Sequence, residues 1–299
     1  MSRFDTRVAI VTGAGRGLGR TYAEYLASRG ARVVVNNRRR LVDDEGLTTA
    51  EQVVRSIRAA GGEAVANLED VTDPGSGPGM VQQALDTWGR LDILVNNAGI
   101  DQHRAFHHLD VAEFRRIFDV NFYGSLYVTH AAYACMRSAG YGRIVMSTSS
   151  AGLHGLHGLS AYAAAKGALI ALTRTLAQEG AARGVLVNAV APYATTQMTA
   201  AHVSPQLAEL LGPELVAPLV AYLVGEQTRV NGAVIVAGKG WFRRAAAVEG
   251  LGAGVYAHEE LSPEAIERKL DRILDAAGAR EFENAVAAFD DFVRQSESR

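Results

Sequence analysis

The start of the chain most constrains its fold, because a short strand, a glycine-rich turn and a helix follow one another directly. Residues 7–11 (RVAIV) are mostly apolar with two valines and an isoleucine, residues 12–19 (TGAGRGLG) contain four glycines, and residues 18–28 have the apolar spacing of a helix. Glycines at such a turn let the backbone approach a pyrophosphate closely, and the helix N-terminus offers it free N–H groups. The order strand, turn, helix therefore favours a dinucleotide-binding unit.

The same alternation of strands and helices continues along the chain. We expect further strands at 32–36, 63–67, 91–96, 143–147, 185–190 and 233–236, and helices at 49–60, 80–88, 111–139 and 162–182. The strand interiors are apolar on both faces, as in parallel sheets covered by helices on each side. The sequence thus predicts a doubly wound, Rossmann-type α/β fold with a parallel seven-stranded sheet.

The alternation stops near Lys239-Gly240, which divides the chain into two parts. We assign residues 1–240 to a dinucleotide-binding and catalytic domain and residues 241–299 to a helical C-terminal extension. Within the extension, Ser262-Pro263-Glu264 is typical of a helix start. Four apolar residues of the extension recur at helical spacing and form one stripe: Phe282, Val286, Phe289 and Val293. This stripe packs on the main domain, or it covers the substrate cleft or a subunit interface.

Composition excludes several classes of partner. With 30 basic and 32 acidic residues the net charge is -2, so we expect neither a nucleic acid nor a membrane surface as partner. The N-terminus does not read as a signal peptide, and no apolar run approaches the roughly 18 residues of a membrane helix. Cys135 is the single cysteine, which argues against a disulfide framework. We expect a cytoplasmic protein.

His154 and His157 lack further ligands at suitable spacing, so no metal site is expected.

The residues after the second expected strand bear on the choice of cofactor. An acid there accepts a hydrogen bond from the ribose 2′-hydroxyl of NAD, whereas a cation accommodates the 2′-phosphate of NADP. Asn36-Asn37-Arg38-Arg39-Arg40 holds no acid, and Arg16 of the glycine turn could reach the same phosphate. Guanidinium groups suit phosphate because they are planar and always charged. NADP(H) is therefore favoured, while NAD(H) stays possible if these arginines are only a solvated cluster.

Tyr162 and Lys166 are four residues apart, so they share one face of the expected helix. A phenol has a pKa of about 10 and is a poor acid or base near neutrality, but a neighbouring cation favours its ionised form. Such pairs also occur as mere surface neighbours. Ser149 lies just past a strand, where its hydroxyl could donate to a developing oxyanion or simply belong to a polar loop. Asn121 could hold a water that reaches Lys166, or it could kink or brace its helix.

Together these elements resemble the short-chain dehydrogenase/reductase family. The matching segments, in the family's order, are residues 12–19, 70–71, 96–99, 121, 149, 162–166 and 188–192. The resemblance implies a catalytic tetrad of Asn121, Ser149, Tyr162 and Lys166, in which Lys166 binds the nicotinamide ribose and lowers the Tyr162 pKa. The cofactor contacts that it implies are Gly13, Arg16, Gly17, Leu18, Gly19, Asn37, Arg38, Asp70, Val71, Asn97, Ala98, Gly99, Tyr162, Lys166, Pro192 and Thr195.

A narrower resemblance covers most of the chain. Residues 33–36, 64–67, 142–146, 213–223 and 237–241 are similar to the (3R)-hydroxyacyl-CoA dehydrogenase part of peroxisomal multifunctional enzymes of type 2, which also has a C-terminal extension. This chain departs from that group in two places. Asn37 replaces the usual acid, which puts the group's NAD preference in doubt, and Tyr193 replaces a glycine that many relatives carry after the proline.

These observations predict an oxidoreductase that interconverts a ketone and a secondary alcohol, with Tyr162 as acid and base. The substrate could be an acyl thioester, a polyketide-like ketone or a steroid-like ring. Candidates for the pocket wall are Gln102, His103, Arg104, His154, His157 and Tyr193 to Met198. The apolar helices at 111–139 and 162–182 suggest a homodimer or homotetramer. The alternatives are a catalytically silent dinucleotide-binding regulatory protein and an assembly protein.

Overall fold

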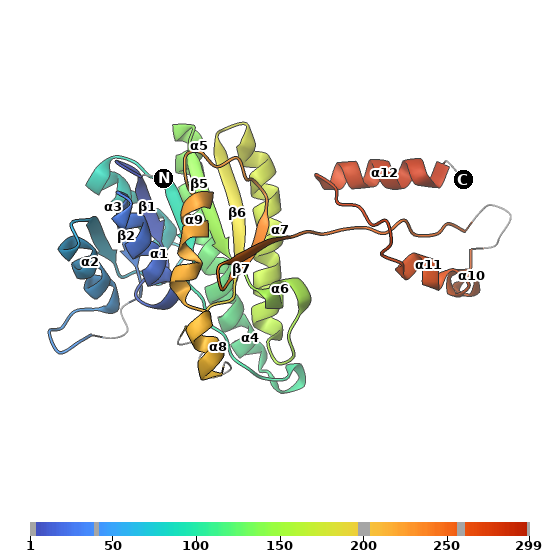
Figure 1. Ribbon diagram of the computed structural model, residues 1–299, viewed down its shortest axis with the longest axis horizontal. Coiled ribbons are helices and arrows are strands. Elements are labelled where there is room, and N and C mark those ends of the chain that lie inside the picture. Colours follow the sequence, from blue (N-terminus) through green and yellow to red (C-terminus); the bar gives the residue numbers. More distant parts are fainter. Residues whose placement is uncertain (1–3, 39–41, 197–203, 256–260, 298–299) are drawn as a thin grey trace. The chain divides into compact units, whose positions relative to one another are not determined.

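The computed structural model describes residues 4–38, 42–196, 204–255 and 261–297. The chain divides into two compact units, residues 1–245 and 246–299. The first unit is built on one eight-stranded sheet with the strand order β3-β2-β1-β4-β5-β6-β7-β8 (Figure 1). Strands β1 to β7 are parallel and β8 is antiparallel to β7. The predicted doubly wound α/β fold is therefore confirmed.

The elements of the first unit follow the predicted alternation closely. The strands are β1 (Val8–Val11), β2 (Arg32–Asn36), β3 (Glu63–Asn67), β4 (Ile93–Asn96), β5 (Gly142–Ser147), β6 (Val185–Pro192), β7 (Val234–Gly238) and β8 (Trp241–Ala245). The helices are α1 (Gly17–Ser28), α2 (Thr49–Ala59), α3 (Ser76–Trp88), α4 (Val111–Phe118), α5 (Gly124–Ala139), α6 (Ser150–His154), α7 (Ser160–Ala181), α8 (Pro205–Leu210) and α9 (Ala217–Leu223). Three short helical segments complete the list: η1 (Phe106–His108), η2 (Asp119–Tyr123) and η4 (Pro213–Leu215).

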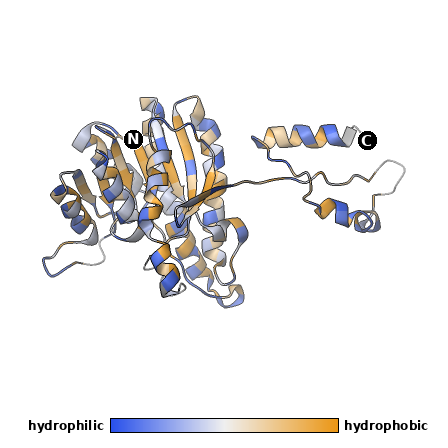
Figure 2. Ribbon diagram, viewed as in Figure 1, coloured by the Kyte–Doolittle hydropathy of each residue, from blue (hydrophilic) through white to orange (hydrophobic). Residues whose placement is uncertain are grey.

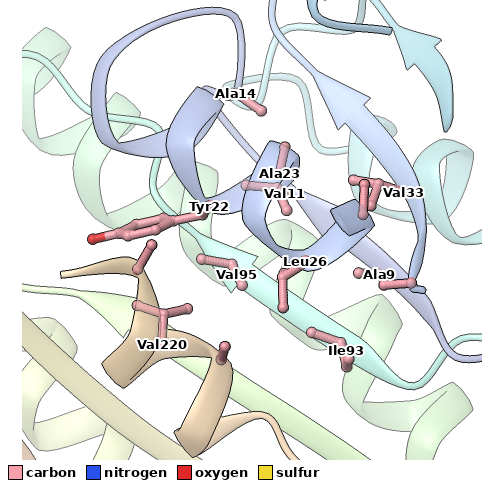
Figure 3. Packing of buried hydrophobic residues seen from close by; sticks show 14 of the residues in the cluster. Ala9, Val11, Ala14, Tyr22, Ala23, Leu26, Val33, Ile93, Val95 and Val220 are labelled. Atoms are coloured by element: carbon pink, nitrogen blue, oxygen red, sulfur yellow. The ribbon is translucent and has the colours of Figure 1, made fainter. Parts of the chain in front are cut away.

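Two apolar cores lie on opposite faces of the sheet, because successive strand residues point to opposite sides. Val33 belongs to the core under α1, α2 and α9, whereas its neighbour Val34 belongs to the core under α3, α5 and α7. In the first core, Tyr22 and Leu26 of α1 pack among strand residues and Val220 of α9 (Figure 3). The strands are apolar along most of their length (Figure 2). This double covering leaves the carboxyl ends of the strands as the open edge where polar side chains gather.

The strand β8 corrects the predicted domain boundary. Trp241–Ala245 was assigned to the helical extension, but it pairs with β7 as an eighth strand. Lys239 and Gly240 form the tight turn between them, with φ angles of 53° and 70°. Four of the five side chains of β8 are exposed, so this strand lacks the buried apolar pattern by which the others were predicted.

The long helix predicted at 111–139 is also interrupted. α4 and α5 are separated by the π-helical segment η2, which contains Asn121. α6 was not predicted, and α3 begins at Ser76, four residues before the helix predicted at 80–88. Each difference lies where an element is short or where a glycine-rich segment joins a helix.

The second unit contains α10 (Pro263–Glu267), α11 (Leu270–Leu274) and α12 (Ala285–Glu297). The predicted helix start is confirmed, because the Ser262 hydroxyl accepts a hydrogen bond from the Ala265 N–H at 3.2 Å and Pro263 opens the first turn. Val286 and Phe289 lie exposed on α12. Over the part of the chain that the structure describes, no helix has the length and apolar character needed to cross a membrane.

Candidate active site

The backbone of the glycine turn after β1 packs directly against the backbone of the segment after β4. Gly13 has a φ of +62°, and a Cβ placed on it would lie 2.8 Å from the Ala98 Cα. A Cβ on Gly19 would lie 2.4 Å from the Gly13 carbonyl oxygen. The Asn97 side chain donates to the carbonyls of Thr12 and Gly13, at 3.1 and 3.2 Å. The turn is thus fixed against the end of β4, as expected where a pyrophosphate approaches a helix N-terminus.

A first cavity of about 420 Å³ extends from this turn across the ends of β2 and β3. At its far end Arg38 donates to the Asp70 carboxylate at 3.3 Å. Burial raises the pKa of Asp70, but hydrogen bonds from Thr72 and Arg38 outweigh it and hold that pKa below its usual range. Asn37 donates to the Thr49 hydroxyl at 2.7 Å. Residues predicted as cofactor contacts that line this cavity are Gly13, Arg16, Asn37, Arg38, Asp70, Val71, Ala98 and Gly99.

A second cavity of about 360 Å³ leads from the same turn to the carboxyl ends of β5 and β6. Gly13, Arg16 and Gly99 line both cavities, so the two form one cleft along the open edge of the sheet. The predicted residues that line the second cavity are Gly13, Arg16, Gly17, Leu18, Asn97, Gly99, Asn121, Tyr162, Lys166 and Pro192. The cleft therefore brings the glycine turn and three members of the predicted tetrad together.

Lys166 is held in a fixed position inside this cleft. Its side chain comes from α7, the residue is 3% exposed, and its ammonium donates to the Ser147 carbonyl at 2.7 Å. The Thr148 hydroxyl donates to the Lys166 carbonyl, also at 2.7 Å, which ties α7 to the end of β5. Burial lowers the pKa of Lys166 to about 8. The Lys166 ammonium lies 5.5 Å from the centre of the Tyr162 ring, as a pair four residues apart on one helix predicts.

Burial is the largest influence on Tyr162 and raises the pKa of its hydroxyl to about 12. A hydrogen bond with Ser149 acts in the opposite direction, and the Asp101 carboxylate raises the pKa further. The expectation that Lys166 lowers this pKa stays a prediction, because the influences on the Tyr162 pKa in this structure are burial, Ser149 and Asp101. Ser149 begins α6, where its hydroxyl accepts from the Ala151 N–H at 3.1 Å, and this fixes it beside Tyr162.

Asn121 is fully buried in η2 and does brace its helix. Its amide nitrogen donates to the Ile117 carbonyl at 2.8 Å and to the Ile100 carbonyl at 2.7 Å. Its amide oxygen has no hydrogen-bond partner among the residues the structure describes. A Cβ on Gly99 would lie 2.6 Å from this oxygen and 3.6 Å from the Lys166 nitrogen, so both polar atoms face the same point. This is a suitable place for an ordered water.

Some predicted residues lie outside the cleft lining. Gly19 packs against the Gly13 carbonyl within the turn, and Ser149 contacts the site only through its hydrogen bond with Tyr162. Thr195 donates its N–H to the Leu211 carbonyl, and its neighbour Thr196 lines the cavity. The cleft is also lined by residues that were not predicted as cofactor contacts: Asn36, Thr49, Glu69, Ile100, Asp101, Val120, Ser147, Thr148 and Thr196. Asn36 and Ser147 end a strand and Thr148 directly follows one, so the rule that ligands bind at the carboxyl edge could have found them.

The expected substrate-wall residues mostly lie outside this cavity. Gln102 accepts a hydrogen bond from Arg116, and Arg104 forms an ion pair with Glu113 at 3.6 Å. The Arg104 N–H donates to the Gly158 carbonyl at 2.8 Å, which joins the loop after β4 to the loop after α6. Arg39, Arg40 and Met198 lie outside the described residues. Within the described ranges, no three His, Cys, Asp or Glu side chains are grouped to hold a metal ion.

The profile of the short chain dehydrogenase family matches residues 7–207. The chain belongs to the short-chain dehydrogenase/reductase family. It is 41% identical over 283 residues to the peroxisomal multifunctional enzyme type 2 of Mus musculus, covering 93% of this chain and 38% of that protein. It is 36% identical over 252 residues to a 3-oxoacyl-[acyl-carrier-protein] reductase of Synechocystis, covering 79% of this chain and all of that protein.

A solved structure extends the similarity over almost the whole chain. The full-length peroxisomal multifunctional enzyme type 2 of Drosophila melanogaster superposes with a TM-score of 0.83 at 36% identity, covering 98% of this chain and 50% of that one. The narrower resemblance predicted from sequence is thereby confirmed. This chain spans half or less of the multifunctional relatives, so the activity of those whole proteins does not transfer to it directly.

Proposed function

We propose that this short-chain dehydrogenase/reductase is an NADP(H)-preferring enzyme that interconverts a ketone and a secondary alcohol, with Tyr162 as the general acid and base. One observation carries the proposal. The Tyr162 hydroxyl, the buried Lys166 ammonium and the unpartnered Asn121 oxygen lie in a cavity continuous with the glycine turn. A dinucleotide fits that turn, because Gly13 and Gly19 allow the tight backbone packing that places the N-terminus of α1, with its free N–H groups, at the cleft.

The bound nicotinamide would supply or accept the hydride, and the chain's own residues handle the proton. In the reducing direction the Tyr162 hydroxyl donates its proton to the carbonyl oxygen of the substrate. Ser149, hydrogen-bonded to Tyr162, orients that oxygen and stabilises its developing charge. Lys166 and a water on the Asn121 oxygen then restore the Tyr162 proton. Oxidation of the alcohol uses the same groups in reverse.

Turnover tests the proposal directly. The protein is mixed with NADPH and a panel of ketones and 3-oxoacyl thioesters, and the absorbance of the reduced nicotinamide is followed. We expect steady oxidation of NADPH with at least one ketone. The rival is a silent dinucleotide-binding protein, which would bind NADPH and oxidise none of it with any member of the panel.

The raised pKa of Tyr162 predicts opposite pH dependences for the two directions. A group whose pKa is about 12 keeps its proton near neutrality, so it is ready to act as an acid but rarely as a base. We expect kcat/KM for alcohol oxidation to rise about tenfold per pH unit, or about a hundredfold between pH 7 and pH 9, while ketone reduction is not limited by ionisation of Tyr162 there. A rate of oxidation that is flat or falls across this range would contradict the assignment of Tyr162 as the base.

The cofactor preference rests on the residues around Asn37. Arg38 lies at the adenosine end of the cleft, held by Asp70, and Asn37 places an amide where NAD-specific relatives carry an acid. We expect Asn37→Asp to reduce the ratio of kcat/KM for NADPH to that for NADH about tenfold or more, because the new carboxylate repels a 2′-phosphate. Asn37→Ala is the matched control, since it removes the hydrogen bond to Thr49 without adding charge. An unchanged ratio in Asn37→Asp would show that the 2′-phosphate is not bound here.

The names of relatives and the exposed aromatic side chains bear on the substrate class and the assembly. The name of the Synechocystis relative, a 3-oxoacyl-[acyl-carrier-protein] reductase, favours a 3-oxoacyl thioester over a polyketide-like or steroid-like ketone. We also propose a homodimer or homotetramer, because Tyr123, next to α5, is 40% exposed and continues an aromatic row through Tyr127. A cytoplasmic location remains a proposal, supported by the single cysteine.

A further inference from the structure

The backbone of α6 lies in direct contact with the backbone of α7 at Lys166. Gly152 is in α6, and a Cβ placed on it would lie 2.7 Å from the Lys166 carbonyl carbon and 2.8 Å from the Gly167 nitrogen. Both are backbone atoms, so a change of rotamer could not make room for the added carbon. Glycine at this position therefore allows the two helices to approach each other more closely than any side chain would permit.

The residues before Ser149 contact α7 at the same point. The Thr148 hydroxyl donates to the Lys166 carbonyl at 2.7 Å, and Thr148 is buried. The Lys166 ammonium in turn donates to the Ser147 carbonyl at 2.7 Å. The segment that carries Ser149 is thus attached to α7 on both sides of this residue, by Thr148 before it and by Gly152 after it.

Ser149 lies between these contacts and is the residue from which α6 begins. Its hydroxyl accepts a hydrogen bond from the Ala151 N–H at 3.1 Å, which leaves the hydroxyl proton for the bond with Tyr162. Tyr162 is one helical turn before Lys166 on α7. The distance between the two hydroxyl groups therefore depends on how closely α6 approaches α7.

We propose that Gly152 and Thr148 are positioning residues, whose contacts with α7 hold the Ser149 hydroxyl at hydrogen-bonding distance from the phenol. The inference rests on the proposed function, because it gives these contacts a role in catalysis through Ser149. A displacement of about 1 Å at a catalytic group can cost about a hundredfold in rate. A methyl group on Gly152 would force a movement of α6 away from α7 and would carry Ser149 with it.

A double-mutant cycle on kcat for ketone reduction tests the proposal. Gly152→Ala is expected to lower kcat about tenfold to a hundredfold in the wild-type background, but less than about threefold in Ser149→Ala, which has no hydroxyl left to displace. A loss of the same factor in both backgrounds, or no loss in either, would overturn the proposal. Gly167→Ala is the matched control. Its methyl group would lie 3.4 Å from the Gly152 carbonyl oxygen, an ordinary contact, so kcat should stay within about twofold of wild type.

Thr148→Val carries the same test if Gly152→Ala does not fold. It keeps a branched side chain and removes the hydrogen bond to the Lys166 carbonyl. We expect kcat to fall several-fold in the wild-type background and to change little in Ser149→Ala. Equal effects of Thr148→Val in the two backgrounds would show that this contact does not act through Ser149.

A measurement on the protein without cofactor separates this inference from the proposed function. Tyrosine is isotope-labelled at Cζ, and the Tyr162 resonance is assigned by its loss in Tyr162→Phe. Because the chemical shift of Cζ responds to hydrogen bonding of the phenol, Gly152→Ala should move it in the same direction as Ser149→Ala, and Gly167→Ala should leave it in place. An unmoved resonance in Gly152→Ala would overturn the positioning role, even in an enzyme that reduces ketones through Tyr162. A wild-type protein that reduces no ketone would overturn the proposed function instead, while the resonance would still report the position of Ser149.

Discussion

Tyr162→Phe is expected to lower kcat for ketone reduction about a thousandfold, within the range that a positioned acid contributes. The substitution removes the hydroxyl that carries the proton and keeps the ring, which packs in α7 with the Lys166 ammonium 5.5 Å from its centre. The Kd of NADPH should change little, because the glycine turn and the adenosine end of the cleft are untouched. Stopped-flow turnover and a fluorescence titration with NADPH measure the two quantities separately.

Tyr25→Phe is the matched control for this experiment. Its hydroxyl accepts a hydrogen bond from Arg29 on α1 and lies outside the cleft lining, so turnover should remain at the wild-type rate. A Tyr162→Phe protein that reduces ketones within about tenfold of wild type would show that another group carries the proton. A different side chain in the same cavity would then have to donate the proton to the ketone.

The sheet could be predicted because its signal is local. Most of the parallel strands are short β-branched runs that are buried on both faces, and residues such as Val33 and Val34 show this in the sequence itself. The strand β8 has no such signal, since Trp241 and Phe242 are exposed and only the pairing with β7 makes the segment a strand. The π-helical segment η2 was equally invisible, and the Ile100 carbonyl that accepts a hydrogen bond from Asn121 there is brought near only in the folded chain.

The site shows the same division between local and tertiary information. The spacing of Tyr162 and Lys166 is local, and it gave their common helix face correctly. The direction of the Tyr162 pKa shift is a sum over everything packed around the phenol, and its largest cause, burial, cannot be read from the spacing of two residues. The loop after β6 gives a smaller example. Thr196 lines the cavity in place of Thr195, and no sequence period distinguishes the two neighbours.

Gly19→Ala is expected to weaken NADPH binding at least about tenfold and to lower the free energy of unfolding by about 1–3 kcal/mol. The added methyl group would lie 2.4 Å from the Gly13 carbonyl oxygen and 2.4 Å from the Asn97 amide nitrogen. The first of these is backbone and cannot rotate away, so the turn must move from the end of β4. Because the same turn would hold the pyrophosphate, the displacement affects affinity as well as stability.

Gly75→Ala is the matched control for this last variant, because it adds the same methyl group at a right-handed backbone position with φ of -76°. Its nearest neighbour is a side-chain oxygen of Asp73 at 3.3 Å, which can shift, so stability should change by less than about 0.5 kcal/mol and NADPH affinity should not change. Calorimetric unfolding and an NADPH titration of both variants check the pair. If Gly19→Ala bound NADPH as tightly as Gly75→Ala, the contact between Gly13 and Gly19 would not be what shapes the phosphate site, and the pyrophosphate would have to be assigned to another part of the cleft.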